Sequence, residues 1–353
     1  MNGVRLSIAA ILASASLTGA AVAQTTMVAG IDALREWNLV VLGDLQSSSE
    51  VEGRTFVGGN LGGSSSNYLI SSGTTTSTTG QPGLTVVGNV TGGTKNLNNG
   101  SGAIVGGNVD SGFNLNGNTQ TVQVGGSISN TNVNQNTVQS GLAASNSTFL
   151  SGLNQQKSLL TSSLTDLSHT LAGLDANSTM TINGNTATFN AVPNSDGVAV
   201  FNITSDQLNR IGEIAFNLNG ADTAIVNVSG GAITLNDNFL GGTNNLGEHV
   251  IWNFDQAKTL DLSTAWGGSI LAPGASATTG NYVQGSAVFG SLVQNGEMHI
   301  GTYGGGYNPP SGSNPGSSSG GDATPIPEAP TVALFLAGLA ALFFARRRLL
   351  RRA

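Results

Sequence analysis

A short glycine-rich pattern that recurs between residues 57 and 128 constrains the fold more than any other feature of the chain. Val-Gly-Gly-Asn or a close variant ends at Asn60, Asn89, Asn108 and Ser127, in steps of 29, 19 and 19 residues. A period of about 20 residues is typical of solenoids, in which each repeat forms one coil stacked on its neighbours. Glycine tolerates the positive φ of tight corners, and asparagine tolerates it better than most residues. The pattern therefore predicts a β-solenoid, with a sandwich of glycine-rich hairpins as the alternative.

Two further patterns extend this prediction along the chain. Gly268-Ser269-Ile270-Leu271 and Gly285-Ser286-Ala287-Val288 repeat 17 residues apart, which predicts a second set of coils. Between the two sets, Phe149 and a series of leucines at steps of three, four and seven predict one amphipathic helix over about 137–174. We expect it to pack along the side of the coils. The predicted fold is mainly β: a right-handed β-solenoid (β-helix-like) body with one long lateral α-helix.

The beginning of the chain has the composition of a secretory signal peptide. Residues 1–23 combine Arg5, an apolar stretch and small residues that end in Ala21-Val22-Ala23. This order is the one at which a signal peptidase cuts, which makes Gln24 the expected first residue of the exported chain. We therefore predict a signal helix at the N-terminus and assign residues 24–303 to the body.

The end of the chain mirrors the beginning. A Gly-, Ser- and Pro-rich linker, 304–326, leads into a tail, 327–353, that contains the uncharged apolar run 331–345 and the basic cluster 346–352. The 15 residues of the run would span about 22 Å as a helix, and snorkelling arginines could help it cross a hydrocarbon core of about 30 Å. We predict a transmembrane helix whose cytoplasmic side is marked by Arg346, Arg347 and Arg348.

Charge and cysteine usage exclude several classes of function. The span 24–330 holds six of the 12 basic residues and all 19 acidic ones, a net charge of −13. Such a body repels phosphate backbones, so we expect no nucleic-acid partner. The chain has no cysteine, which excludes disulfides, thiol catalysis and zinc–cysteine sites.

The histidines are candidate metal ligands or proton carriers. Glu248 precedes His249, and Glu297 lies two residues before His299, so this second pair shares one strand face. No third ligand follows at metal-site spacing, and His169 is expected at the solvent edge of the helix. We predict polar pairs at strand ends, and no metal or cofactor.

Paired carboxylates are candidate catalytic groups for polysaccharide cleavage. Glu50 and Glu52 share one strand face, Asp255 and Asp261 lie near each other in sequence, and Asp44 follows a glycine as a turn residue. Glycoside hydrolysis needs two carboxylates about 5–9.5 Å apart. The body has few Trp, Tyr and Arg residues to hold a sugar. We predict no catalytic residue.

The tail resembles a known sorting signal. Pro327-Glu328-Ala329-Pro330, followed by the apolar run and the arginine cluster, is similar to the PEP-CTERM signal. The resemblance implies a Gram-negative bacterium, transient anchoring in the inner membrane, and processing by an exosortase-like peptidase. It also implies release to the cell surface or extracellular matrix.

The body resembles the choice-of-anchor A domain over roughly residues 30 to 302. The matching segments are 38–45, 50–54, 57–60, 226–230, 252–254, 268–273, Gly285 and 296–299. The resemblance implies an extracellular role and a β-helix with a lateral helix, and it implies no defined activity.

These observations favour an exported, non-catalytic structural or adhesive protein. Expected partners are signal peptidase, an exosortase-like peptidase, and exopolysaccharide or matrix proteins. The alternative is a polysaccharide-active enzyme, which would use Glu50, Glu52 or Glu297. Ice binding ranks third because it needs a threonine lattice on one solenoid face, whereas threonine is concentrated in 74–79 and is not spaced at the coil period.

Overall fold

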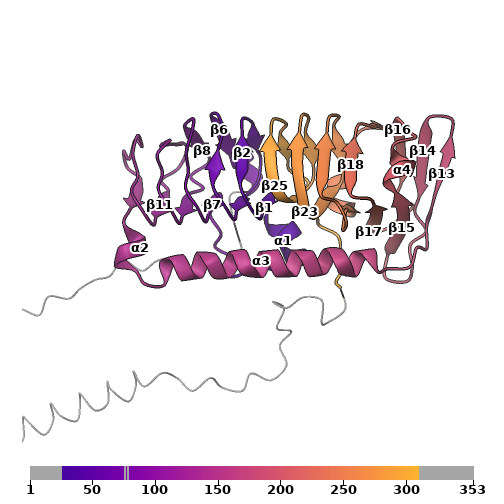
Figure 1. The fold of residues 1–353 in the computed structure, drawn as a ribbon, viewed down its shortest axis with the longest axis horizontal. Coiled ribbons are helices and arrows are strands. Elements are labelled where there is room, and N and C mark those ends of the chain that lie inside the picture. The colour runs from indigo at the N-terminus through magenta and orange to yellow at the C-terminus, as the bar shows by residue number, and fades with distance from the viewer. Residues whose placement is uncertain (1–25, 75–76, 78, 310–353) are drawn as a thin grey trace, which may run out of the picture. The chain divides into compact units, whose positions relative to one another are not determined.

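The computed structural model describes residues 26–74, 77 and 79–309. The chain divides into two units, Met1–Gly316 and Ser317–Ala353, and the second lies wholly outside the described residues. The first unit is a stack of β coils flanked by a long helix (Figure 1). The predicted signal helix and transmembrane helix fall outside the described residues and stay predictions.

The broadest face of the stack, which we name the helix face, is a continuous run of parallel strands. It belongs to a 15-stranded sheet, and its strands follow one another in this order: β12 (Thr137–Gln139), β11 (Thr121–Val124), β9 (Ala103–Val105), β7 (Leu84–Val86), β4 (Thr55–Val57), β1 (Leu39–Val41), β25 (Ala287–Gln294), β23 (Ser269–Thr279), β20 (Val250–Asn253), β17 (Thr223–Ser229) and β15 (Val198–Thr204).

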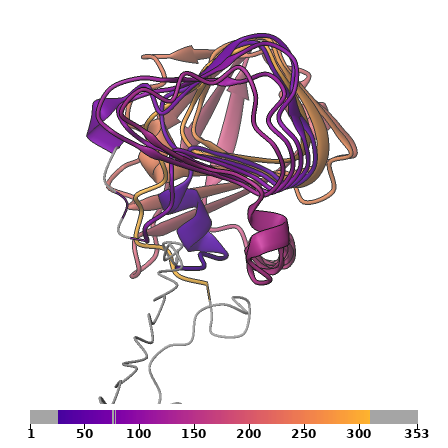
Figure 2. The ribbon, with the colours of Figure 1, turned by 90° about the vertical axis from the view of Figure 1, so that its left-hand side faces the viewer.

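Two other faces complete each coil. The second face is a seven-stranded sheet in the order β10 (Phe113–Leu115), β8 (Lys95–Leu97), β6 (Ser66–Tyr68), β3 (Glu50–Val51), β26 (Met298–His299), β24 (Val283–Gln284) and β22 (Trp266–Gly267). The third face is formed by the later halves of β23 and β25 together with β18 (Ala232–Leu235), β21 (Thr259–Leu262), β2 (Leu45–Ser47) and β5 (Leu61–Gly62). Viewed along the stack, the coils superimpose and enclose one interior (Figure 2).

The order of the coils differs from the order of the sequence. β1 pairs with β4 on one side and with β25 on the other, so Leu39 lies opposite both Thr55 and Ala287. The chain therefore forms its first coil in the middle of the stack and builds coils outward to β12. It then crosses along the stack and builds the remaining coils inward until the last meets the first. Figure 1 shows this junction as indigo strands beside yellow ones.

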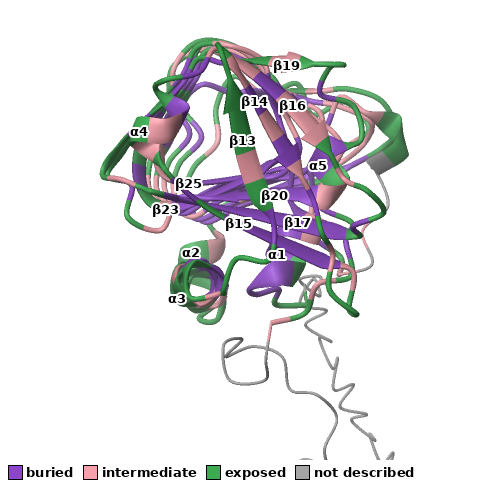
Figure 3. Ribbon diagram, turned by 90° about the vertical axis from the view of Figure 1, so that its right-hand side faces the viewer, coloured by how far each residue is buried: buried purple, intermediate pink, exposed green. Residues whose placement is uncertain are grey.

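The crossing is made by helix α3, Phe149–Ala172. Its residues Leu160, Leu164, Leu167 and Leu171 are fully buried, and they pack against outward side chains of the helix face such as Val40, Leu271 and Val288. Short helix α1 (Ile31–Glu36) lies on the same side of the stack (Figure 3). The prediction of a lateral helix is confirmed. The leucines whose spacing predicted it are the side chains that α3 buries against the helix face.

The predicted start of that helix is wrong. Residues 137–139 form strand β12, and a separate helix, α2 (Leu142–Ser145), precedes α3. The break follows from local chemistry: Asn146 Oδ1 accepts hydrogen bonds from the backbone N and the hydroxyl of Thr148, at 3.0 and 2.9 Å. An amide that bonds its own backbone in this way competes with helix formation.

Strands outside these three faces gather at one end of the stack (Figure 1). A four-stranded sheet contains β13 (Thr179–Asn183), β14 (Thr186–Asn190), β16 (Glu213–Asn217) and β19 (Asn238–Leu240), of which β13 and β14 form an antiparallel hairpin. Helices α4 (Ser205–Leu208) and α5 (Leu246–His249) and the 3₁₀ turn Ser72–Thr74 complete the described elements. Beneath the hairpin, Phe189 packs edge-on against Trp252, with ring centroids 5.4 Å apart. The prediction of a mainly β protein with parallel, solenoid-like strands is confirmed.

No helix in the described part of the chain is long and apolar enough to cross a membrane.

The first residues of the predicted linker lie against the body. Gly304 N and Gly305 N donate to the backbone oxygen of Glu248 at 3.0 and 3.1 Å, and an Arg35 guanidinium nitrogen donates to the oxygens of Gly305 and Tyr307.

The repeated asparagines form a ladder along the coil corners. Asn60 Oδ1 accepts from Asn89 N at 2.9 Å, and Asn89 Oδ1 accepts from Asn108 N at 2.8 Å. Asn108 Oδ1 continues the series by accepting from Ser127 N at 2.9 Å. Each side-chain oxygen thus accepts a hydrogen bond from a backbone N–H of the next coil. Because that N–H needs an acceptor in every coil, asparagine recurs at this position of the repeat.

We expect Asn89→Ala to lower the free energy of unfolding by about 1 kcal/mol, the usual net value of one such hydrogen bond. The control is Asn114→Ala: this exposed amide donates to Asn96 Oδ1 at 2.7 Å and holds no backbone donor. Urea unfolding at constant m-value measures both. An equal effect of the two substitutions would contradict the role of the ladder.

Candidate functional site

Two in-register files of exposed side chains run along the third face. Inward Leu45, Leu61, Val90, Val109 and Ile128 pair in sequence from coil to coil, and β2, β25, β23, β21 and β18 continue the register on the other side. The outward residues on either side of each inward residue therefore form two files. The first file is Ala232, Thr259, Ser276, Ser291, Asp44, Asn60, Asn89, Asn108 and Ser127; the second is Thr234, Asp261, Thr278, Val293, Gln46, Gly62, Thr91, Asp110 and Ser129.

The third face is long, polar and built from small side chains. Its nine coils span about 38 Å at a strand spacing of about 4.8 Å. All members of the files are exposed or half-exposed except Gly62, over which the amide of Gln46 lies. The files contain three carboxylates, Asp44, Asp110 and Asp261, and no basic residue. This surface offers a periodic array of hydroxyl and amide groups.

Three threonines lie together on one part of this face without forming a single file. Thr234, Thr259 and Thr278 lie on neighbouring strands in one region, although they are not spaced at a fixed period. The coils here have unequal lengths: 27 residues separate Ala232 from its partner Thr259, and 17 separate Thr259 from Ser276. Unequal insertions at the corners hide the alignment from any search for a constant period.

Asp44, predicted as a turn residue, is the first member of the amide ladder. Its Oδ1 accepts from Asn60 N at 2.7 Å and from Asn60 Nδ2 at 3.2 Å. Because Asp44 lies on the first coil, the ladder begins at the junction of the first and last coils. A carboxylate replaces the amide there, and the sequence pattern alone did not reveal this relation.

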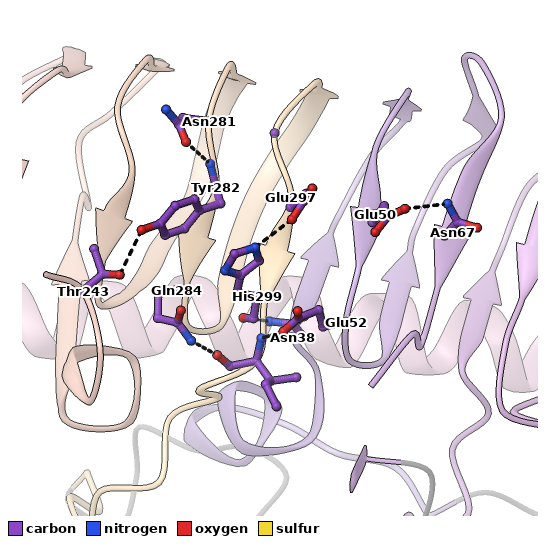
Figure 4. A network of polar contacts seen from close by, with 12 residues as sticks. Asn38, Glu50, Glu52, Asn67, Thr243, Asn281, Tyr282, Gln284, Glu297 and His299 are labelled. Carbon is purple, nitrogen blue, oxygen red and sulfur yellow. Dashed lines mark hydrogen bonds and ion pairs between the residues drawn. The ribbon is translucent and has the colours of Figure 1, made fainter. Parts of the chain in front are cut away.

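The second face carries the predicted Glu-x-His pair in a polar network (Figure 4). Glu297 Oε2 lies 2.8 Å from His299 Nε2, which confirms that the two side chains share a face. The imidazole also stacks on Tyr282, with ring centroids 4.4 Å apart and planes 8° apart. Gln284 Nε2 donates to the backbone oxygen of Ile300 beside this stack.

The candidate catalytic carboxylates are held by structural partners. Glu50 Oε1 accepts from Asn67 Nδ2 at 2.9 Å, and Glu52 Oε2 accepts from Ile300 N at 2.7 Å. Pairing of Val51 with Met298 places Glu50 of β3 beside Glu297, the residue that precedes β26. Asp255 and Asp261 are not brought together, because Asp255 contacts His169 of α3 whereas Asp261 is exposed on β21.

The other histidines have single partners. His169 is exposed on α3, as predicted, and its Nδ1 contacts the carboxylate of Asp255. His249 Nδ1 lies 2.8 Å from the backbone oxygen of Asp222. Among the residues that the structure describes, no group of three or more His, Asp or Glu side chains could hold a metal ion.

Two charged side chains, Lys95 and Asp237, are buried in the structure although the sequence did not predict their burial. Lys95 is fully buried, and its Nζ donates to the backbone oxygens of Gly62 and Ser64 at 3.2 and 2.6 Å; burial lowers its pKa to about 8. Asp237 is also fully buried, and neither carboxylate oxygen has a hydrogen-bond partner within the described ranges. Burial raises the pKa of Asp237 to about 7. No sequence pattern distinguishes either residue from a surface charge.

The predicted sorting and processing residues lie outside the described residues. They are Ala21, Ala23, Gln24, Pro327, Glu328, Pro330, Arg346, Arg347 and Arg348.

Comparison with known proteins identifies the body. No curated protein and no solved structure matches the chain. One family model does match, over residues 30–300, and its description is "Putative Ice-binding-like adhesive domain". The match covers most of the solenoid, from α1 to the last coil. The chain therefore belongs to this family of ice-binding-like adhesive domains.

Proposed function

We propose that this protein is a non-catalytic adhesin of the cell surface or extracellular matrix, and that the third face is its contact surface. The observation that carries the proposal is the pair of in-register polar files over nine coils. Membership of an adhesive-domain family supports it, because such a domain acts at a surface or outside the cell.

The physical basis is a rigid surface with many weak, evenly spaced contacts. Strands hold the files in place, and Ser, Thr and Asn have short side chains, so little conformational freedom is lost on binding. Several contacts that form together give an affinity far above that of each one. A partner with its own repeat, such as a polysaccharide or a fibrous matrix protein, is suited to such a surface.

We also propose the delivery route that the sequence implies. Signal peptidase would release the chain before Gln24, and an exosortase-like peptidase would process the tail near Pro327 after transient anchoring in the inner membrane. The PEP-CTERM-like order of motif, apolar run and arginine cluster supports this route, as does the resemblance of the body to the choice-of-anchor A domain. The host would then be a Gram-negative bacterium.

A cell-based experiment tests location and adhesion together. We expect the intact mass from the producing cells to lack residues 1–23 and the basic tail, and the protein to be found in the matrix fraction. Deletion of its gene should reduce the attachment of cells to one another or to their matrix. Normal attachment without the protein would contradict the adhesive function, whereas a retained tail would contradict only the sorting route.

The enzymatic alternative has a direct test. If Glu50 and Glu297, which are neighbours on the second face, acted as a catalytic pair, incubation with the matrix polysaccharide would produce new reducing ends. Glu50→Gln or Glu297→Gln would abolish them. We expect no reducing ends from the wild-type protein.

Ice binding is a second candidate because the family description names it and because Thr234, Thr259 and Thr278 share one region of the third face. The files are interrupted there by Asp261 and Val293. We expect no thermal hysteresis in dilute solution, and clear hysteresis that Thr259→Lys removes would reverse this ranking.

A further inference from the structure

The outward file at the centre of the helix face has polar side chains at both of its ends. In register from one end to the other, its members are Gln139, Gln123, Ile104, Thr85, Phe56, Val40, Val288, Leu271, Asn253, Asn227 and Asn202. The apolar centre is covered by α1 and α3. Helix α3 forms hydrogen bonds with one polar end and leaves a groove at the other.

At the asparagine end, the helix satisfies the amides. Asn227 Nδ2 donates to the backbone oxygen of Leu171 at 2.7 Å, and Asn253 Nδ2 donates to that of Ser168 at 2.9 Å. The Ser168 hydroxyl returns a bond of 2.6 Å to Asn253 Oδ1. The polar groups of this end therefore hold the last turns of α3 on the sheet.

At the glutamine end, α3 leaves an open groove of about 890 Å³. Thr85, Ile104 and Gln123 line it on the side of the coils, Gly152 and Gln155 line it on the side of α3, and Met27 also lines it. A second groove of about 510 Å³ shares Ile104 and Gln123 and continues over Thr121 and Gln139. The helix reaches these coils through Phe149 and Leu153, which lie over Gly125 and Gly106.

Hydrogen-bonding groups at this end lack a partner in the described part of the chain. Thr85 is 3% exposed and lines the first groove, yet its Oγ1 has no hydrogen bond. Ser101 is half-buried and lines the second groove, and its Oγ atom is buried and unpaired. Because an unsatisfied buried polar atom costs about 1–3 kcal/mol, these atoms mark places where a ligand can supply the missing bond.

The groove is uncharged as well as polar. None of the residues described along either groove carries a charge, and the whole segment 111–156 contains no Asp, Glu, Lys or Arg. A ligand with a phosphate, sulfate or carboxylate would find no counter-charge here and would meet a strongly acidic protein. Amide and hydroxyl groups beside the apolar faces of Ile104, Phe149 and Met27 suit a molecule that is rich in hydroxyls and has apolar patches of its own.

From these observations we propose that the groove between α3 and strands β7, β9 and β11 binds an uncharged polysaccharide chain. The hydroxyls of the sugar would satisfy Thr85 Oγ1 and Ser101 Oγ and would bond the amides of Gln123 and Gln139. The groove lies on the helix face, so it is a second binding site, distinct from the third face. The protein would thereby hold a soluble glycan chain on one face while another face adheres to a surface.

Affinity electrophoresis of the full chain tests this site. Gels would contain a neutral polysaccharide (dextran, pullulan or galactomannan) or an acidic one (alginate or polygalacturonate). We expect retardation by at least one neutral polymer and by neither acidic one. Thr85→Val should weaken the apparent Kd about fivefold, as expected for one neutral hydrogen bond. Gly152→Trp should abolish retardation, because Gly152 faces open space in the groove and the indole would fill it.

Two controls separate the groove from the fold and from the third face. Thr279→Val removes another buried, unpaired hydroxyl, from strand β23 outside the groove, and should leave the apparent Kd unchanged. Thr259→Lys combined with Thr278→Lys alters the third face and should also leave it unchanged. The proposal is overturned if no neutral polymer retards the protein, if an acidic one does so more strongly, or if Thr85→Val and Gly152→Trp bind like the wild type. It is also overturned if the third-face variant loses binding.

Discussion

Replacing Gly106 with alanine is expected to lower the free energy of unfolding by at least about 3 kcal/mol, the upper range for overpacking a core. Gly106 belongs to the repeated corner, where neighbouring coils are in close contact. A Cβ atom at this position would lie 2.1 Å from the backbone oxygen of Val87 in the preceding coil. A backbone oxygen cannot move aside like a flexible side chain, so the coils would have to separate.

Gly152→Ala is the matched control for this prediction. Gly152 lies inside α3, and no atom would lie within 4 Å of its Cβ. Alanine should therefore raise the free energy of unfolding by about 0.5–1 kcal/mol, as for a glycine in a helix interior. Urea unfolding of the full chain measures both changes. A Gly106→Ala protein as stable as the wild type would show that the coils are not in close contact at these corners.

The stability of the protein should fall as the pH rises from about 4 to 7, because of Asp237. Its pKa is raised from an ordinary value of 3.8 to about 7 in the folded protein. Below pH 4 the carboxyl is protonated in both states and has no effect. Between pH 4 and 7 the unfolded chain loses this proton while the folded protein keeps it, so unfolding becomes more favourable by up to about 4 kcal/mol. Above pH 7 the effect is constant.

Asp237→Asn should remove this slope and make the protein more stable than the wild type at pH 8. Lys95 provides the comparison. Its pKa falls from 10.5 to about 8 on folding, so its destabilising effect is present below pH 8 and disappears as the pH rises to 10.5. Lys95→Met should therefore change the slope above pH 8 and leave the slope between pH 4 and 7 intact. An unchanged slope in Asp237→Asn between pH 4 and 7 would contradict the assignment.

Local patterns were enough to predict the type of fold. The corner asparagines Asn60, Asn89 and Asn108 repeat because each bonds the next coil, and the leucines of α3 repeat because one helix face is buried. Both repeats result from packing within or between adjacent repeats, so they can be recognised in a single sequence. The pairing of β1 with β25 could not be predicted, because the coil repeats do not specify which coil stacks on which.

The candidate site could be predicted only in part for the same reason. The contact between Glu297 and His299 follows from strand alternation over two residues. The third face depends on the register of nine coils of unequal length, and the groove depends on where α3 departs from the sheet. Likewise, segments far away in the sequence determine whether a charged residue such as Asp237 becomes buried.

The most direct test of the adhesive function is the binding of third-face variants to the matrix of the producing cells. Thr259→Lys combined with Thr278→Lys places two long, charged side chains at exposed positions of strands β21 and β23. The control is Thr161→Lys, on the exposed side of α3. The proposed contact surface predicts that the double variant binds the matrix at least about tenfold more weakly, a loss of about 1.4 kcal/mol, while the control binds normally. Equal binding of wild type, control and double variant, all with unchanged thermal stability, would show that the third face is not the adhesive surface.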